Sequence, residues 1–143
     1  HLRPLITLLA FCLMSTHFHL IVWQRDPAGI ATLMNSVTSS YTRYFNAKYG
    51  NTQPLFCGPL CAKPIETRKY FRWLVGYVHD NHPSGLDYEF SSHRAWTDRE
   101  QLPDWLDPAP ALAVFGGVEG YRSYLDSRRR KQALDRELGF GRA

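Results

Sequence analysis

The chain has 143 residues, of which 44% are apolar and 21% charged, a composition that excludes a disordered or collagen-like segment and indicates one globular core. The formal net charge of +4 is concentrated in the first part of the chain: residues 1–83 carry eight basic and three acidic side chains, and residues 84–143 carry nine and ten. A basic front half suits a polyanionic partner. Three cysteines are too few for a secreted disulfide scaffold, so a reducing, cytoplasmic location is expected.

The first predicted element is a β-hairpin. Residues 8–14 and 17–23 are apolar runs rich in β-branched and aromatic side chains, and Ser15 and Thr16 separate them. The whole stretch from Leu5 to Trp23 approaches membrane-spanning length, which leaves a membrane anchor as an alternative. Because its two histidines would be costly in hydrocarbon, we expect a buried sheet and no membrane.

A long amphipathic helix is predicted over residues 27–49. Asp26-Pro27 is typical of a helix start, and Gly50 is typical of a helix end. The apolar positions, spaced by three and four residues, are Ile30, Leu33, Met34, Val37, Tyr41, Tyr44 and Phe45. Residues 51–66 hold three prolines and are expected to form a loop with at most one short edge strand.

A second helix is predicted from near Thr67 to just before His82-Pro83, with an apolar stripe along one side. That stripe contains Tyr70, Phe71, Leu74, Val75 and Val78. Residues 84–110 read as irregular, with a short helix near 104–115. A last helix over 119–138 ends in a charged tract, whose arginines at 128–130 either contact DNA or only keep the helix soluble. Strands grouped with helices that cover one face indicate an α+β fold.

A pair of histidines is the first candidate for chemistry. Side chains alternate along a strand, so His17 and His19 share one face, about 6–7 Å apart at the backbone. Two neutral imidazoles placed in this way can converge on one divalent ion. Two histidines that are simply hydrogen-bonded inside a polar pocket would give the same pattern, and this alternative stays open.

Tyr77 and Asn81 are the second candidate, because they lie one helical turn apart on the flank of the apolar stripe. Beside a metal ion that polarises a phosphodiester, a tyrosine oxygen can attack phosphorus and form a covalent phosphotyrosine. Two imidazoles and one amide oxygen suit Mg²⁺ or Mn²⁺ more than structural Zn²⁺. A tyrosine that only packs against the core, with its hydroxyl in water, is the alternative.

Basic and aromatic side chains also interleave along both predicted helices. This mixture suits single-stranded nucleic acid, with phosphates on cations and bases on rings, although an ordinary solvated helix face looks similar. The candidate DNA-binding residues are Arg43, Lys48, Arg68, Lys69, Arg72 and Trp73.

Several of these segments resemble one family in the family's own order. The segment AFCLMSTHFHLIV is similar to the HUH segment of the REP-associated tyrosine transposases, which belong to the one-tyrosine HUH transposases. The usual sequence of that segment in the family is close to MPNHFHLLV. Five further similar segments follow in the family's order, so the resemblance extends from Leu8 to Leu125. These segments are SYTRYFNAKYG, YVHDNHPSGL, SSHRAW, LPDWLDPAPALAVFG and GYRSYL. The departures are Ser15-Thr16 in place of Pro-Asn, and Asn81-His82-Pro83 in place of Asn-Pro.

The resemblance implies a metal-dependent single-stranded DNA endonuclease and strand transferase that acts on REP-like hairpin DNA. Carried over by position, His17 and His19 are the metal-binding pair, Asn81 is the third ligand for Mg²⁺ or Mn²⁺, and Tyr77 is the nucleophile that forms a 5′-phosphotyrosine. Tyr70 is the competing nucleophile, placed second because its position on the helix is nearer the apolar stripe. His79 belongs to the motif without an assigned role.

The implied fold is a ferredoxin-like antiparallel sheet with helices on one face. Because seven residues precede Leu8, the chain is expected to lack the family's first strand and helix, which leaves a sheet edge without its partner. Residues 1–95 would form the transposase core, and residues 96–143 a C-terminal helical extension. A truncated remnant that binds DNA without catalysis is the alternative function, and the residues do not decide between a monomer and a homodimer.

Overall fold

The computed structural model describes residues 4–140 and shows an α+β protein, so the predicted fold class is confirmed. Contacts divide the chain into two compact units. Unit 1 holds the described residues up to Thr7 together with Val22–Ile65, and unit 2 holds Leu8–Ile21 together with the described residues from Glu66 onward. The expected boundary between residues 95 and 96 falls inside unit 2. Each unit is described separately below.

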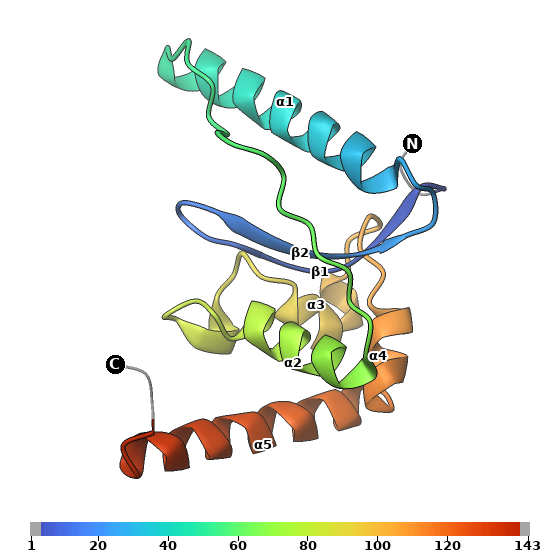
Figure 1. Cartoon of the computed structure of the whole chain (residues 1–143), viewed down its shortest axis with the longest axis vertical. Helices are drawn as coiled ribbons and strands as arrows, with labels where there is room; N and C mark the ends of the chain where they lie inside the picture. The colour runs from blue at the N-terminus through green and yellow to red at the C-terminus, as the bar shows by residue number, and fades with distance from the viewer. Residues whose placement is uncertain (1–3, 141–143) are drawn as a thin grey trace. The chain divides into compact units, whose positions relative to one another are not determined.

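The two strands form the predicted hairpin. Strand β1 is Ile6–Leu13 and strand β2 is Phe18–Gln24, which pair as a two-stranded antiparallel sheet (Figure 1). The Met14 N–H donates to the His17 carbonyl at 2.8 Å, which closes the turn at Ser15 and Thr16. His17 itself lies one residue before β2. The ferredoxin-like arrangement of a larger sheet stays a prediction.

Unit 1 contains one long helix, α1, over Gly29–Tyr49. The Asp26 carboxylate accepts the Ala28 N–H at 2.8 Å just ahead of the helix, and Gly50 ends it in the left-handed region at φ 64°. The predicted apolar stripe is only partly buried. Leu33 and Met34 are buried, but four members of the stripe or its continuation are exposed: Val37, Tyr41, Tyr44 and Tyr49. Residues 51–66 contain no strand.

Unit 2 contains the other helices. They are α2 (Arg68–His79), α3 (His93–Thr97), α4 (Ala109–Phe115) and α5 (Val118–Glu137), with 3₁₀ turns at Gly85–Asp87 and Arg99–Gln101. The Thr67 side chain accepts the Tyr70 N–H at 3.1 Å and so begins α2 where the sequence predicted. Within this unit α2 lies between the hairpin and α5 (Figure 1). Helix α3 was not predicted, because the segment around it has no apolar periodicity.

The edge of β1 that faces away from β2 is occupied within unit 2. The sheet of the described residues has only these two strands, and the expected edge without its strand partner stays a prediction. The Leu13 N–H donates to the Phe90 carbonyl at 2.8 Å, and the Ser92 N–H donates to the Phe11 carbonyl at 2.9 Å. Further along, the Asp107 N–H donates to the Leu8 carbonyl at 3.0 Å. Segments that follow α2 therefore take up backbone groups that would otherwise face solvent.

No helix among residues 4–140 is both long enough and apolar enough to cross a membrane. The apolar stretch that raised this possibility folds mainly as the hairpin.

The turn between α4 and α5 depends on a close backbone approach at Gly120. A Cβ atom built on Gly120 would overlap the Phe115 carbonyl oxygen, which is backbone and has little freedom to move. We expect Gly120→Ala to lower the free energy of unfolding by about 1–3 kcal/mol, the usual cost of overpacking. Urea unfolding followed by circular dichroism measures this loss. Ser123→Ala, at an exposed position of the same helix, is the control; equal stability of both variants would contradict the prediction.

Candidate functional site

The four residues predicted to carry the chemistry lie together in unit 2. The rings of His17 and His19 have centroids 5.0 Å apart and are nearly perpendicular. The His19 ring lies 5.6 Å from the Tyr77 ring, and its Nε2 atom lies 3.3 Å from the Asn81 amide nitrogen. Tyr77 and Asn81 are therefore brought to the histidines from the far end of α2, across a long sequence separation.

The two imidazoles differ in environment. His17 is exposed, and its Nδ1 lies 3.0 Å from the Thr16 hydroxyl oxygen. His19 is half-buried, and this burial, together with the charge of His17, lowers the pKa of His19 from its ordinary value. His19 therefore stays neutral at physiological pH and keeps a lone pair for a hydrogen bond or a metal ion.

The orientation of Asn81 bears on its predicted role as a ligand. As placed, its amide N–H donates to Nε2 of His19, which fixes that atom as an acceptor with the ring proton on Nδ1. Rotating the amide by 180° exchanges its nitrogen and oxygen, and then an imidazole nitrogen and an amide oxygen face the same space. Two imidazole nitrogens and one amide oxygen fit a divalent cation of the Mg²⁺ or Mn²⁺ class.

Among the described residues, no group of three or more His, Cys, Asp or Glu side chains is placed to hold a metal. The predicted set consists of two histidines and an asparagine, whose amide oxygen is also a possible ligand. The predicted ligand set is therefore compatible with the geometry, and the metal itself stays a prediction.

Tyr77 is half-buried and lies in a row of three rings along α2, which we call the aromatic row: Tyr70, Trp73 and Tyr77. Trp73 and Tyr77 have centroids 5.3 Å apart with planes 13° apart, and Tyr70 and Trp73 have centroids 6.0 Å apart, also at 13°. Tyr70 is 40% exposed, so its predicted place near the buried stripe is wrong. It lies against Trp73 at the far end of the row, whereas Tyr77 contacts His19.

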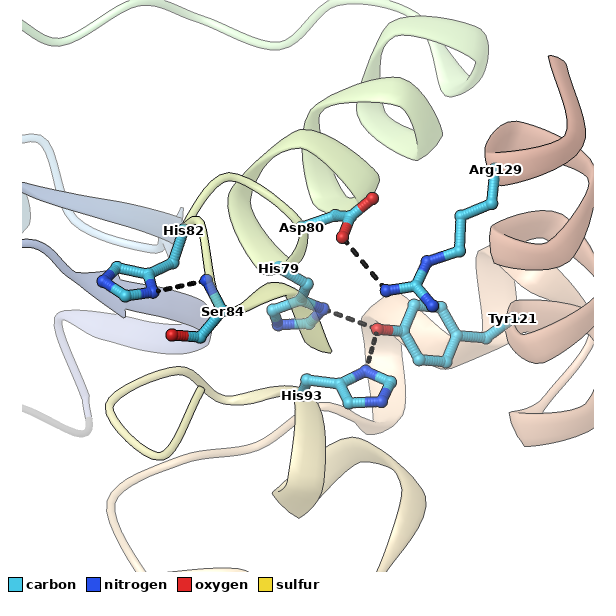
Figure 2. Close-up of polar contacts among 7 residues, drawn as sticks. All are labelled: His79, Asp80, His82, Ser84, His93, Tyr121 and Arg129. Atoms are coloured by element: carbon cyan, nitrogen blue, oxygen red, sulfur yellow. Dashed lines mark hydrogen bonds and ion pairs between the residues drawn. The ribbon is translucent and has the colours of Figure 1, made fainter. Parts of the chain in front are cut away.

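A buried polar cluster supports α2 just beyond Tyr77, and sequence reasoning missed most of it (Figure 2). His79 is fully buried, with its Nδ1 2.7 Å from the Tyr121 hydroxyl and its Nε2 2.6 Å from the Ser92 hydroxyl. The Ser92 oxygen also accepts the Phe11 N–H of β1 at 2.8 Å. One imidazole thus joins α2 to α5, to the start of α3 and to the hairpin.

A second histidine shares the same phenol. Nδ1 of His93 lies 2.7 Å from the Tyr121 hydroxyl, which can donate to one imidazole and accept from the other. Burial and the neighbouring His93 lower the pKa of His79 to about 3, and burial likewise lowers the pKa of His93. Burial also raises the pKa of Tyr121. Both rings are therefore neutral at physiological pH. In this state one ring can donate its N–H to the Tyr121 hydroxyl, and the other can accept the hydroxyl proton.

An ion pair lies at the C-terminal end of α2, beside this cluster. The Arg129 guanidinium of α5 donates to the Asp80 carboxylate at 3.2 Å, as Figure 2 shows. Asp80 directly follows α2 and directly precedes Asn81. The contact therefore ties to α5 the short segment that carries the predicted third ligand.

The predicted DNA-binding residues fall in both units. Arg43 and Lys48 belong to α1 in unit 1, where the Lys48 ammonium lies 3.3 Å from the Tyr44 hydroxyl oxygen. Arg68 and Lys69 are exposed in the first turn of α2 in unit 2. Arg72 is half-buried, and its guanidinium lies over the rings of Phe115 and Tyr124, at 5.5 and 4.9 Å from their centroids. We therefore treat Arg72 as a packing residue.

Comparison with known proteins adds no family to this geometry. The chain matches no protein-family model, no curated protein and no solved structure.

Proposed function

We propose that this chain is a single-stranded DNA endonuclease and strand transferase of the REP-associated tyrosine transposase type. The observation that carries the proposal is the convergence of His17, His19, Asn81 and Tyr77 in one place, although Tyr77 comes from a different element and is distant in sequence. Tyr77 is the tyrosine that the resemblance pairs with the H-x-H segment, and its ring lies 5.6 Å from that of His19, between centroids.

Tyr77 is the nucleophile in this proposal. Its phenol oxygen attacks the scissile phosphorus, the bond from phosphorus to the 3′ oxygen breaks, and the protein becomes joined to the 5′ phosphate. The phenol loses its proton and the departing 3′ oxygen gains one. Because the phosphotyrosine ester keeps the energy of the broken bond, attack by another 3′-OH rejoins the strand.

His17, His19 and Asn81 would hold Mg²⁺ or Mn²⁺ beside Tyr77. When bound, such an ion polarises the scissile phosphate and offsets its negative charge. The lowered pKa of His19 favours this role, because only a neutral imidazole can donate its lone pair.

Positive side chains would hold the DNA backbone. We assign this role to Arg43, Lys48, Arg68 and Lys69, which are exposed and whose neighbouring sequences are rich in aromatic residues. The substrate class is single-stranded DNA that forms a REP-like hairpin, and the expected compartment is the cytoplasm.

The deciding experiment detects a covalent adduct. The purified protein is incubated with Mn²⁺ and single-stranded oligonucleotides that carry repeat hairpins from the flanking genomic DNA, labelled at either end. A 5′-phosphotyrosine predicts an SDS-resistant adduct that carries the 3′ label, together with a free fragment that carries the 5′ label. Tyr77→Phe and His19→Ala should abolish the adduct, and Tyr70→Phe is the matched control that should retain it.

The reverse pattern would overturn the assignment. An adduct that survives in Tyr77→Phe and disappears in Tyr70→Phe would place the nucleophile at Tyr70. DNA binding without an adduct, from the wild-type chain under all metal conditions, would instead support a remnant that only binds DNA.

A further inference from the structure

The aromatic row on α2 is an exposed surface as well as a support for Tyr77. Tyr70 is 40% exposed and Trp73 is 45% exposed, although large aromatic side chains are usually buried. Their planes are nearly parallel to each other and to that of Tyr77. The row therefore presents aligned aromatic surface that begins at the candidate nucleophile and runs back along the helix.

An arginine from another helix joins this row. The guanidinium carbon of Arg128 in α5 lies 5.7 Å from the centroid of the Trp73 ring. It reaches Trp73 by crossing α2 at Gly76, where a Cβ atom would stand 2.9 Å from Cδ of Arg128 and 3.2 Å from its Nε. The missing side chain at Gly76 thus leaves the space through which the arginine stem passes.

The charge of Arg128 is not neutralised by a carboxylate among residues 4–140. The next residue, Arg129, pairs with Asp80 at 3.2 Å, whereas Nε of Arg128 is buried without a hydrogen-bond partner in the described part of the chain. Helix α2 itself carries three basic residues and no acidic one. A positive group beside parallel rings matches the two recognition elements of single-stranded nucleic acid, which are its phosphates and its bases.

We propose that Tyr70, Trp73 and Arg128 form a nucleotide-binding surface for the single-stranded DNA adjacent to the scissile phosphate. Bases of the strand stack against Tyr70 and Trp73, and Arg128 binds a backbone phosphate between them and Tyr77. This inference rests on the proposed function, since it takes the strand at Tyr77 to be DNA. It adds a binding role for Tyr70 and Arg128, and it explains why α5 approaches α2 at a glycine.

The test measures binding without chemistry. The full chain is used with Tyr77→Phe as the background and EDTA in the buffer, so that neither cleavage nor metal binding contributes. Fluorescence anisotropy with a labelled 12-nucleotide single strand gives the affinity over a series of salt concentrations. The variants on this background are Trp73→Ala, Trp73→Phe and Arg128→Gln, with Arg130→Gln and Trp105→Ala as matched controls at other exposed positions.

The surface predicts a distinct result for each variant. Trp73→Ala should weaken binding by about 10-fold, since one base loses its stacking partner, and Trp73→Phe should restore most of the affinity. Arg128→Gln should weaken binding and reduce the slope of log affinity against log salt by about 0.7, the value for one phosphate contact on a single strand. Arg130→Gln and Trp105→Ala should bind like the background protein. A duplex of the same sequence should bind more weakly, because its bases are already stacked.

Failure of this inference can be separated from failure of the proposed function. If the Tyr77 adduct forms but Trp73→Ala and Arg128→Gln bind like the background, the surface is refuted and the function stands. If no adduct forms but both variants lose affinity as described, the surface stands and the catalytic proposal fails. Equal affinity for single strand and duplex would also refute the surface.

Discussion

Replacing Trp96 by alanine is expected to lower the free energy of unfolding by about 3–5 kcal/mol, the usual range for deleting a buried tryptophan. Trp96 is 2% exposed, and its indole N–H donates to the Leu9 carbonyl at 2.9 Å. Its ring packs 5.0 Å from His79 and 4.9 Å from Tyr121, between centroids. The substitution therefore leaves a cavity and also removes the donor that satisfies a buried backbone carbonyl.

Urea unfolding followed by circular dichroism measures the effect. Trp105→Ala is the matched control, because Trp105 is 59% exposed and its ring lies 5.6 Å from that of Phe11, between centroids. It should change stability by less than about 1 kcal/mol. If both variants lose the same stability, Trp96 does not have the place in the core that the structure gives it.

The second large effect expected is a loss of stability on mild acidification, caused by His79. This imidazole is fully buried with a pKa of about 3 in the folded chain, whereas in the unfolded chain it takes up a proton near pH 6.5. Between these values the unfolded state binds more protons, so stability falls as the pH falls. From pH 7.5 to 5 the folding equilibrium constant should drop by roughly 30-fold from this group alone. The lowered pKa of His93 adds a change of the same sign.

Chemical denaturation at several pH values between 7.5 and 5 tests this expectation. This window lies above most carboxylate titrations, so histidines dominate it. His79→Gln keeps a donor and an acceptor but does not titrate, and it should flatten the pH dependence by nearly one proton. His17→Gln, at an exposed imidazole, is the control. An unchanged slope in His79→Gln would show that His79 is protonated in the folded protein.

The hairpin and the ends of the two main helices were predicted well from the sequence. The hairpin turn at Ser15 and Thr16, the end of the long helix at Gly50 and the start of α2 at Thr67 all depend on local backbone chemistry, which the residues themselves determine. Burial along α1 was predicted less well. Its apolar period extends to Tyr44, yet that residue is exposed, because a periodic stripe states which face is apolar and not whether another element covers it.

The candidate site divides in the same way. The histidine pair and the tyrosine motif could be found because each is a short sequence pattern, and the resemblance supplied the connection between them. The cluster around His79 could not be found, since Ser92 and His93 lie at the start of α3, Tyr121 lies in α5, and no spacing rule relates these positions to α2. A histidine within an apolar helix stripe, two residues after the candidate nucleophile, was the only local signal.

Each compact unit is built from two separate stretches of the sequence, so the protein cannot be cut into its units at a single position. The linker after α1 separates a segment that contains His17 and His19 from a segment that contains Tyr77, yet these residues belong to the same unit. A polypeptide that starts at Glu66 keeps most of the mass of unit 2 but loses the strand pair on which α3 and the following segments are hydrogen-bonded. Neither half of the chain corresponds to one of the two compact units. Unit 2 takes residues from both halves, so Tyr77 and the histidine pair come together only when both halves are present.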